Sequence, residues 1–199
     1  MWRAAPDPDD AALAHRALAG ENAAFTELAA RHKVWLFRFI RRYVGNDDDA
    51  LDLLQDSLVA TWLALHQYDA ARPFHAWLRR IALNKCRDWT RRKLLRGIVR
   101  YVSGDLDLFA AEPRRSNPEV MLNDSQSLWR LDQAIAALPP RLREPLILTV
   151  FEELSTRETA VQLNVSEKAV ETRLHRARKR LAKVIVKSDL SLMIEGTPP

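Results

Sequence analysis

The chain has 199 residues, of which 47% are hydrophobic and 29% are charged, with a formal net charge of +5. This composition is typical of a folded protein with one large or two small domains, and it excludes collagen-like, mucin-like and wholly disordered chains. The single cysteine, Cys86, cannot form an intramolecular disulfide, so we expect a reducing cytoplasmic setting. No apolar run approaches the roughly 20 residues that span a bilayer, and the first residues lack the apolar stretch of a signal peptide, so we expect neither membrane insertion nor export.

The positive charge is concentrated in two segments. Positions 79–100 hold nine Lys or Arg residues and one acid, and positions 168–187 hold eight and one. Between them, positions 103–124 hold five acids and two arginines. Basic clusters of this kind favour a polyanionic partner such as nucleic acid. The sequence therefore predicts two basic modules on either side of an acidic tether.

The first half of the chain has apolar residues every three or four positions, which predicts helices. One amphipathic stretch, of one or two helices, begins near Asn22 and is broken at 45–47. A second helix follows, with an acidic first turn that suits the helix dipole. Its predicted inward stripe is Leu51, Leu54, Leu58, Trp62 and Leu65. We expect a loop over 67–73 and a third helix from Phe74 through the basic run, and the absence of period-two alternation argues against strands.

The helical periodicity disappears after Tyr101, where Gly, Pro, Ser and Asn collect, and it resumes near Leu128. Four further helices fit into the rest of the chain. The predicted fold is therefore all-α, with two small helical domains joined by a flexible linker. The expected boundaries are a first domain at 1–100, an acidic linker at 101–124, a second, four-helix domain at 125–187 and a tail at 188–199 that is too short for a large sensing domain.

The clearest local pattern lies near the end of the chain. Ser155 and Glu158 have the spacing of a capping box, and Ser166 predicts a second N-cap. Between them Asn164 tolerates left-handed backbone angles and can reverse the chain in a tight turn. The second helix, from Glu167 to about Val186, would turn apolar positions inward and basic ones outward, as in a helix-turn-helix that enters the major groove. Ordinary amphipathic helices also carry basic faces, so the caps and the turn are what favour this interpretation.

Four stretches, in this order, match motifs of one known family. Residues 49–62, D-A-L-D-L-L-Q-D-S-L-V-A-T-W, resemble its polymerase-binding helix, and residues 74–84, F-H-A-W-L-R-R-I-A-L-N, with the basic segment 88–92, resemble its minus-10 region. Residues 138–144 and 174–181 resemble the two ends of its promoter-reading domain. The chain thus resembles, over most of its length, the extracytoplasmic-function (ECF) group of bacterial RNA polymerase sigma factors.

The resemblance implies a sigma factor that binds core RNA polymerase and directs promoter-specific transcription initiation. Such a protein is not an enzyme and needs no cofactor. The residues expected to dock on a coiled coil of the largest polymerase subunit are Asp49, Asp52, Leu53, Gln55 and Asp56. A plainer alternative is that the acids are only helix N-terminal charges and the leucines only core.

The resemblance further implies that the loop before the third helix, and the helix itself, capture unpaired bases of the minus-10 element. The amide of Asn84 can donate to and accept from a flipped base, and nearby Lys and Arg side chains can hold the phosphates. The residues expected in this site are His66, Arg72, Arg80, Asn84, Lys85, Arg87, Trp89, Arg91 and Arg92. Trp77 is expected in the core, whereas Trp89 suits either the core or base stacking.

The second domain is expected to bind the minus-35 duplex. By resemblance, its DNA-binding residues are Ser166, Lys168, Glu171, Thr172, Arg173 and Arg176. Arg173 and Arg176 are the expected readers of guanine, and Lys168 the expected phosphate contact. The resemblance also implies a regulatory partner, an anti-sigma factor, often membrane-anchored, that masks the polymerase and DNA surfaces.

Three residues depart from the family pattern. Thr159 stands where an aliphatic residue is usual, so we expect a buried hydroxyl that bonds a carbonyl of its own helix. Asn164 stands in place of the usual turn glycine. Pro145 removes a backbone donor early in a helix, which predicts either a helix start near Arg143 or a bend.

Two other classes of protein were weighed against this interpretation. A free-standing helix-turn-helix regulator would explain residues 126–186 but would leave the segment 49–62 and Asn84 without a role. A metal-dependent nuclease could use the acids at the start of the second helix, but these have an ordinary dipole explanation. We predict no metal site, because ligand spacing is lacking at His66, His75 and Cys86.

Overall fold

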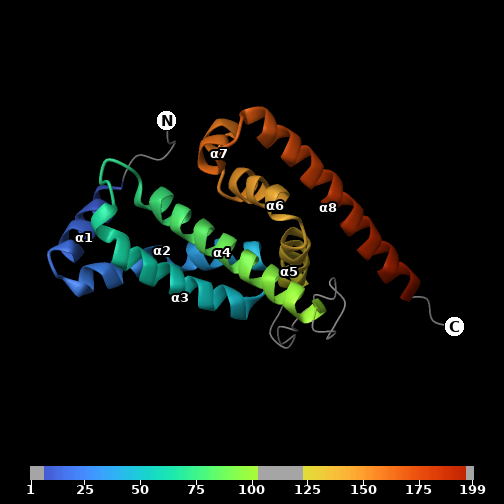
Figure 1. Ribbon diagram of the computed structural model, residues 1–199, viewed down its shortest axis with the longest axis horizontal. Helices are drawn as coiled ribbons and strands as arrows, with labels where there is room; N and C mark the ends of the chain where they lie inside the picture. Colours follow the sequence, from blue (N-terminus) through green and yellow to red (C-terminus); the bar gives the residue numbers. More distant parts are fainter. Residues whose placement is uncertain (1–6, 103–122, 196–199) are drawn as a thin grey trace. The chain divides into compact units, whose positions relative to one another are not determined.

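The computed structural model describes residues 7–102 and 123–195, and every regular element in these two ranges is helical (Figure 1). The predicted all-α class is confirmed. The chain divides into two compact units, Met1–Val120 and Met121–Pro199. Most of the predicted linker, residues 103–122, and the last part of the predicted tail, residues 196–199, lie outside the described residues.

The described part of the first unit, residues 7–102, contains four α-helices and one short 3-10 helix. These are α1 (Pro8–Leu18), α2 (Asn22–Val44), α3 (Asp47–Ala64), η1 (Leu65–Gln67) and α4 (Phe74–Val102). The central helix α2 packs against α1, α3 and α4, and α4 also packs against α3. Large apolar side chains of α2 fill the core, among them Leu28, Leu36, Phe39, Ile40 and Tyr43. The predicted stretch after Asn22 is therefore one continuous helix, and α1 is an element that the apolar spacing did not predict.

The predicted break before α3 is built from a glycine and a capping asparagine. Gly45 has a φ of 85°, in the left-handed region where glycine carries no steric cost, and its N–H bonds the Arg41 carbonyl at 2.7 Å. Asn46 then caps α3, because its side-chain oxygen accepts a hydrogen bond from the N–H of Asp49 at 2.8 Å. The turn therefore ends one helix and starts the next within two residues.

The inward face of α3 matches the predicted leucine and tryptophan stripe only in part. Leu54 is buried as predicted, and so is Leu65 in η1, but Leu51 and Trp62 are 47% and 39% exposed. Besides Leu54, the helix buries Ala50, Leu53, Ser57 and Thr61. The hydroxyl of Ser57 donates to the Leu53 carbonyl at 2.6 Å, and that of Thr61 to the Ser57 carbonyl at 2.7 Å. Two buried polar residues are thus satisfied within their own helix, which is why hydropathy alone misplaced this face.

Within residues 123–195, the second unit contains four α-helices, as predicted. They are α5 (Asn123–Ala136), α6 (Pro140–Leu146), α7 (Thr156–Leu163) and α8 (Glu167–Glu195), with a π-helical turn, η3 (Ile147–Phe151), after α6. The long helix α8 packs against α5, α6 and α7, and it buries the predicted positions Val170, Leu174 and Ala177. It continues past its predicted end near Val186, because the sequence places no Gly or Pro before Gly196.

Pro145 and Thr159 are accommodated differently from expectation. The helix α6 starts at Pro140, not at Arg143, and it passes through Pro145 before the wider π-helical turn begins. The fully buried Thr159 hydroxyl has no carbonyl partner in its own helix. It lies 3.4 Å from the hydroxyl of Thr149, which donates to the Pro145 carbonyl at 2.7 Å. Two of the three departures from the family pattern, Pro145 and Thr159, are therefore linked through the hydroxyl of Thr149.

Candidate polymerase and nucleic-acid interfaces

The solvent-facing side of α3 changes character along the helix. Its amino-terminal half is polar, and its carboxyl-terminal half is apolar, with Val59 and Leu63 58% and 68% exposed. We call this surface the outer face of α3, and it consists of Asp48, Leu51, Asp52, Gln55, Asp56, Val59, Trp62 and Leu63. The predicted docking residues Asp52, Gln55 and Asp56 belong to it. Of its exposed apolar members, Leu51 and Trp62 are residues that the apolar spacing had placed on the inward stripe.

Two other predicted docking residues are not freely exposed. Leu53 is 2% exposed and packs inside the first unit. Asp49 is half-buried, and its carboxylate accepts a hydrogen bond from the Asn46 side-chain amide at 2.6 Å while its N–H is capped by the same residue. Leu53 therefore packs beneath the helix and Asp49 takes part in its N-terminal cap, and the contacts of both with polymerase stay predictions.

The loop between η1 and α4 is held by a compact set of hydrogen bonds. The Asp69 side chain accepts from the N–H of Ala71 at 3.0 Å, and its carbonyl accepts from the N–H of Arg72 at 2.9 Å. The hydroxyl of Tyr68 donates to the Arg72 carbonyl at 2.8 Å. Of the predicted minus-10 residues, His66 and Arg72 lie in this segment with exposed side chains. The loop is thus a braced turn.

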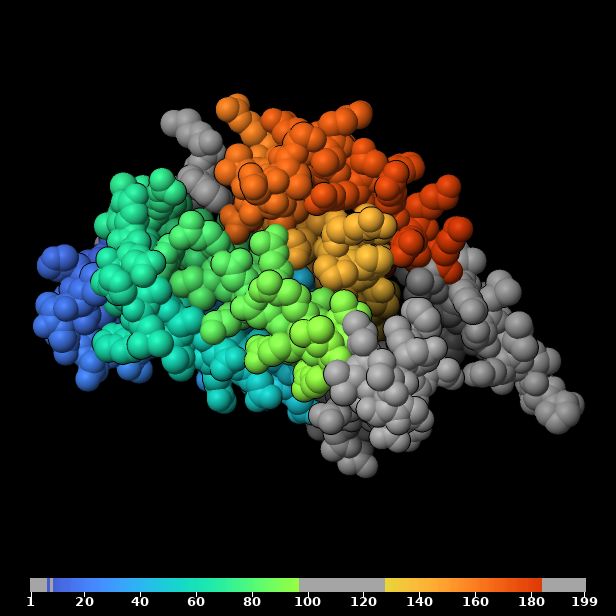
Figure 2. All heavy atoms as spheres, in the orientation of Figure 1, coloured from blue at the N-terminus to red at the C-terminus, as the bar shows by residue number. Residues whose placement is uncertain are grey.

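Four of the predicted minus-10 residues share one side of α4. Arg80, Asn84, Arg87 and Arg91 follow at intervals of three or four residues, which places them on one helix face. All but the half-buried Arg87 are exposed. Figure 2 shows α4, in green, along the visible surface of the first unit. The exposed amide of Asn84 therefore has basic side chains about one helical turn away on either side.

A second strip of α4 adjoins the outer face of α3. Lys85, Asp88, Arg91, Arg92 and Leu95 line a surface hollow together with Asp56 of α3. Asp88 forms an ion pair with Arg91. A residue expected to contact polymerase thus lies beside residues expected to contact DNA, a juxtaposition that the sequence did not indicate.

Both tryptophans of α4 are buried. Trp77 packs in the core as predicted, with its ring 5.5 Å from that of Phe74. The ring of Trp89 is also buried, and the ammonium of Lys93 lies 4.6 Å from its centroid. Of the two alternatives for Trp89, its burial agrees with the core, and its part in the minus-10 site stays a prediction.

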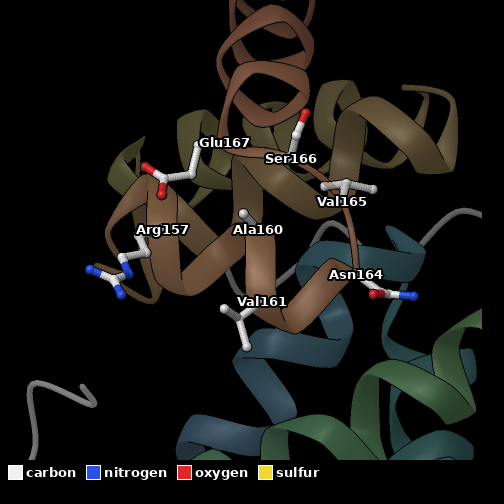
Figure 3. A pocket seen from close by; sticks show the side chains of 7 residues that line it. All are labelled: Arg157, Ala160, Val161, Asn164, Val165, Ser166 and Glu167. Atoms are coloured by element: carbon white, nitrogen blue, oxygen red, sulfur yellow. The ribbon is translucent and has the colours of Figure 1, made fainter.

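The helix-turn-helix has the predicted local geometry. The N–H of Ser155 donates to the Glu158 carboxylate at 2.9 Å, and the Glu158 N–H donates to the Ser155 hydroxyl at 3.2 Å, which confirms the capping box. Asn164 has φ 54° and ψ 53°, the predicted left-handed turn. Ser166 caps α8 by accepting from the N–H of Ala169 at 3.2 Å. Figure 3 shows the small hollow beside this turn, lined from α7 by Arg157, Ala160 and Val161 and beyond it by Asn164, Val165, Ser166 and Glu167.

All six predicted minus-35 residues lie at the start of α8 or within its first ten residues. Ser166, Lys168, Glu171, Thr172 and Arg176 are exposed, and Arg173 is half-buried. The ammonium of Lys168 lies 3.3 Å from the Glu171 carboxylate, and the Thr172 hydroxyl donates to the Lys168 carbonyl at 2.9 Å. The exposed side of α8 therefore presents a basic, hydrogen-bonding surface of the kind that enters a major groove.

Metal binding and membrane insertion can be examined for the described ranges, 7–102 and 123–195. There, no group of three or more His, Cys, Asp and Glu side chains is arranged to hold a metal ion. No described helix combines the length and the apolar character that crossing a membrane requires.

Comparison with known proteins assigns the chain to a family. The family model for Sigma-70 region 2 matches residues 28–105, and that for Sigma-70, region 4 matches residues 128–181. RNA polymerase sigma factor CnrH of Cupriavidus metallidurans is 37% identical over 183 residues, which cover 90% of this chain and 96% of that protein. The ECF RNA polymerase sigma factor SigF of Caulobacter vibrioides is 33% identical over 183 residues, 89% of this chain and 94% of SigF. This chain belongs to the ECF RNA polymerase sigma factors.

Solved structures agree with the assignment. The structure of CnrH in complex with the cytosolic domain of CnrY matches with a TM-score of 0.62 and 33% identity, covering 90% of this chain and 98% of that one. The sigma factor RpoE of Bartonella quintana, in complex with the anti-sigma factor NepR, shares the fold with a TM-score of 0.63 at 22% identity. The sigma factor described here directs promoter-specific transcription initiation. The first unit matches Sigma-70 region 2, which a free-standing helix-turn-helix regulator would not contain. The regulator alternative is therefore not supported.

Proposed function

We propose how this sigma factor divides its task among three surfaces. The outer face of α3 docks on core RNA polymerase. The loop between η1 and α4, with the outward side of α4, holds the unpaired minus-10 strand. The amino-terminal part of α8 binds the minus-35 duplex. The single observation that supports this most strongly is the exposed Asn84 amide with basic side chains on either side of it on one helix face.

The proposed docking surface combines carboxylates with apolar side chains. Val59 and Leu63 are largely exposed on the same face as Asp52 and Asp56. Clustered exposed apolar residues mark interaction sites, and carboxylates add orientation and specificity toward a basic partner. In this proposal Leu53 contributes only by holding α3 in place.

On the DNA side, the proposal assigns recognition by residue chemistry. Asn84 hydrogen-bonds the edge of an unpaired base, while Arg80 and Arg91 neutralise phosphates. On α8, Arg176 and Arg173 read bases of the minus-35 duplex and Lys168 contacts a phosphate. The sigma factor acts by recognition and forms no covalent bond. Its proposed place is the cytoplasm, where core polymerase meets promoter DNA, and cell fractionation tests this.

Transcription by purified core polymerase on a genomic fragment library, with and without this protein, tests the proposal. We expect defined start sites that share two spaced motifs. Asp56→Arg should lower the affinity for core polymerase at least tenfold, because it places a cation where a carboxylate meets a basic partner, an effect of about 1.4 kcal/mol or more. Asp9→Arg, on exposed α1, makes the same charge change as a control. An affinity equal to that of the wild type would refute docking through Asp56.

We further propose a protein inhibitor that occludes these surfaces. The support is by likeness: CnrH was solved in complex with the cytosolic domain of CnrY, and RpoE in complex with an anti-sigma factor. The exposed apolar end of the outer face of α3 offers area for such a partner. An inhibitor captured with this sigma factor should compete with core polymerase in a binding assay, and simultaneous binding of both would contradict the proposal.

A further inference from the structure

A buried carboxylate in α1 has no role in the function described so far. Asp10 is 5% exposed, and its Oδ2 lies 2.8 Å from Nε2 of His32 in α2. Its Oδ1 lies 3.6 Å from the guanidinium of Arg31. Buried charges are stabilised only when they are paired and hydrogen-bonded. The neighbouring Asp9, also on α1, lies 3.9 Å from the same guanidinium, but its side chain is 75% exposed, so of these two acids Asp10 alone is buried.

The pair continues into a chain of packed rings. The His32 ring lies 5.2 Å, centroid to centroid, from Phe74 and 6.1 Å from His75, the first two residues of α4. His75 in turn lies 3.8 Å from the ring of Trp35. Phe74 is almost fully buried, so its position depends on these neighbours. The buried carboxylate therefore supports, through His32, the start of the helix that carries Asn84.

The chain of rings ends on the loop between η1 and α4. The Tyr68 ring packs edge-on against Phe74 at 5.2 Å and lies 5.4 Å from Trp77. Burial, then the negative charges of Asp10 and Asp69, raises the pKa of Tyr68. The hydroxyl thus stays protonated and donates to the Arg72 carbonyl, and α1 also packs directly on η1.

We propose that Asp10 and His32 are positioning residues for the minus-10 site. Through Phe74 and Tyr68 they hold the loop between η1 and α4 in the shape that receives the unpaired strand. A preorganised loop loses less conformational freedom on binding, so affinity rises without a new contact to DNA. This inference rests on the proposed minus-10 function of that loop.

The test uses holoenzyme, reconstituted from core polymerase and the full chain, and a fluorescent single-stranded oligonucleotide that carries the minus-10 sequence found by start-site mapping. Asp10→Asn and His32→Ala should lower oligonucleotide affinity about 3- to 30-fold, the range for coupling carried through packed side chains. Core polymerase affinity should change less than about twofold in the same variants. His32→Gln, which keeps a donor near the carboxylate, should restore most of the loss. Asp9→Asn is the matched control, because it removes a carboxylate from the same helix that contacts Arg31, at 3.9 Å, but not His32.

Tyr68→Phe tests the far end of the chain of rings with minimal risk to folding. It keeps the half-buried ring and removes only the hydroxyl that donates to the Arg72 carbonyl. We expect it to lower oligonucleotide affinity while leaving core polymerase binding unchanged.

Three results would overturn the inference. Asp10→Asn could behave like Asp9→Asn. Its oligonucleotide and core polymerase affinities could fall in proportion, as for a general loss of folding. Or His32→Gln could bind as poorly as His32→Ala. Asn84→Ala separates these failures from failure of the proposed function: if it binds the oligonucleotide normally, the site itself is misplaced, whereas if it binds poorly and Asp10→Asn binds normally, only the positioning role is refuted.

Discussion

Among the described residues, two that are not glycine adopt left-handed backbone angles, one within the helix-turn-helix and one just before it. Asn164 forms the turn at φ 54°, and Glu153, in the connection before α7, has φ 53°. Asparagine is among the residues that tolerate this region, whereas an ordinary side chain there carries a steric cost of roughly 1 to 2 kcal/mol. The turn at Asn164 could be predicted because asparagine stands where a turn was needed. Glu153 gave no such signal, because glutamate has no preference for this conformation.

Glu153→Gly should therefore stabilise the second unit. The gain should be about 0.5 to 1 kcal/mol, because relief of the steric cost exceeds the entropy that glycine loses on folding. Thermal unfolding followed by circular dichroism measures it. Asn164→Val, which places a β-branched side chain at the other left-handed position, should lower stability. A loss of stability in Glu153→Gly would contradict the prediction.

At the scale of elements, local signals predicted helix ends well and helix faces less well. The capping box at Ser155 and Glu158 could be predicted because both partners lie within one turn. The full inward face of α3 could not be predicted, because it includes the polar residues Ser57 and Thr61. Their hydroxyls can be buried because each donates a hydrogen bond to a carbonyl of the same helix. The element α1 was missed because its inward face is made largely of alanine, although Asp7 before Pro8 is a helix-start pattern that could have indicated it.

The ends of α5 and α6 are tied together by one side chain. The buried guanidinium of Arg143 donates to the Leu138 carbonyl at 2.8 Å and also to the Ala136 carbonyl. These are carbonyls at and just after the carboxyl end of α5, which have few partners in their own helix. Arg143→Met should lower the free energy of unfolding by about 1.5 to 3 kcal/mol, as expected for hydrogen bonds from a charged donor.

Urea unfolding measures this loss. Arg141→Met, at an exposed position of the same helix, makes the same substitution and should change stability by less than about 0.5 kcal/mol. Equal stabilities of the two variants would show that Arg143 does not close this end of the bundle.

At the scale of the whole molecule, charge predicted the nature of the partners but not the arrangement of the sites. Among the side chains that the structure describes, most Lys and Arg residues of the two basic segments are exposed on α4 and α8, whereas Arg79 is buried. The hollow that Asp56 shares with Lys85 and Arg92, and the pairing of Asp10 with His32, depend on how separate helices pack. Contacts between different helices cannot be predicted from the spacing of residues within one helix. These features are therefore seen only in the structure.

The stability of the whole chain should depend on pH through His75. Burial, then the positive charge of Arg79 and the neighbouring His32, lowers the pKa of His75 from 6.5 to about 3. The folded state therefore keeps this ring neutral where the unfolded state binds a proton. Its contribution is fully present above pH 6.5 and is lost as the pH falls from 6.5 toward 3, by up to about 1.4 kcal/mol per pH unit.

Melting temperatures recorded between pH 7.5 and pH 5 check this dependence. His75→Phe, which keeps a ring against Trp35 and cannot titrate, should show a shallower decline toward acid. Parallel curves for the two proteins would assign the acid sensitivity to other groups.

The hollow between α3 and α4 gives the two proposed binding events a common electrostatic element. In the free protein the carboxylate of Asp56 stands beside Lys85, Arg91 and Arg92 and opposes the approach of a phosphate. If core polymerase docks through Asp56 as proposed, a polymerase cation that neutralises this carboxylate would remove that opposition, and docking would raise the affinity for DNA. By thermodynamic reciprocity, bound DNA would raise the affinity for polymerase to the same extent. An unassembled sigma factor would then pass over promoter sites, and commitment to a promoter would begin only after the holoenzyme has formed.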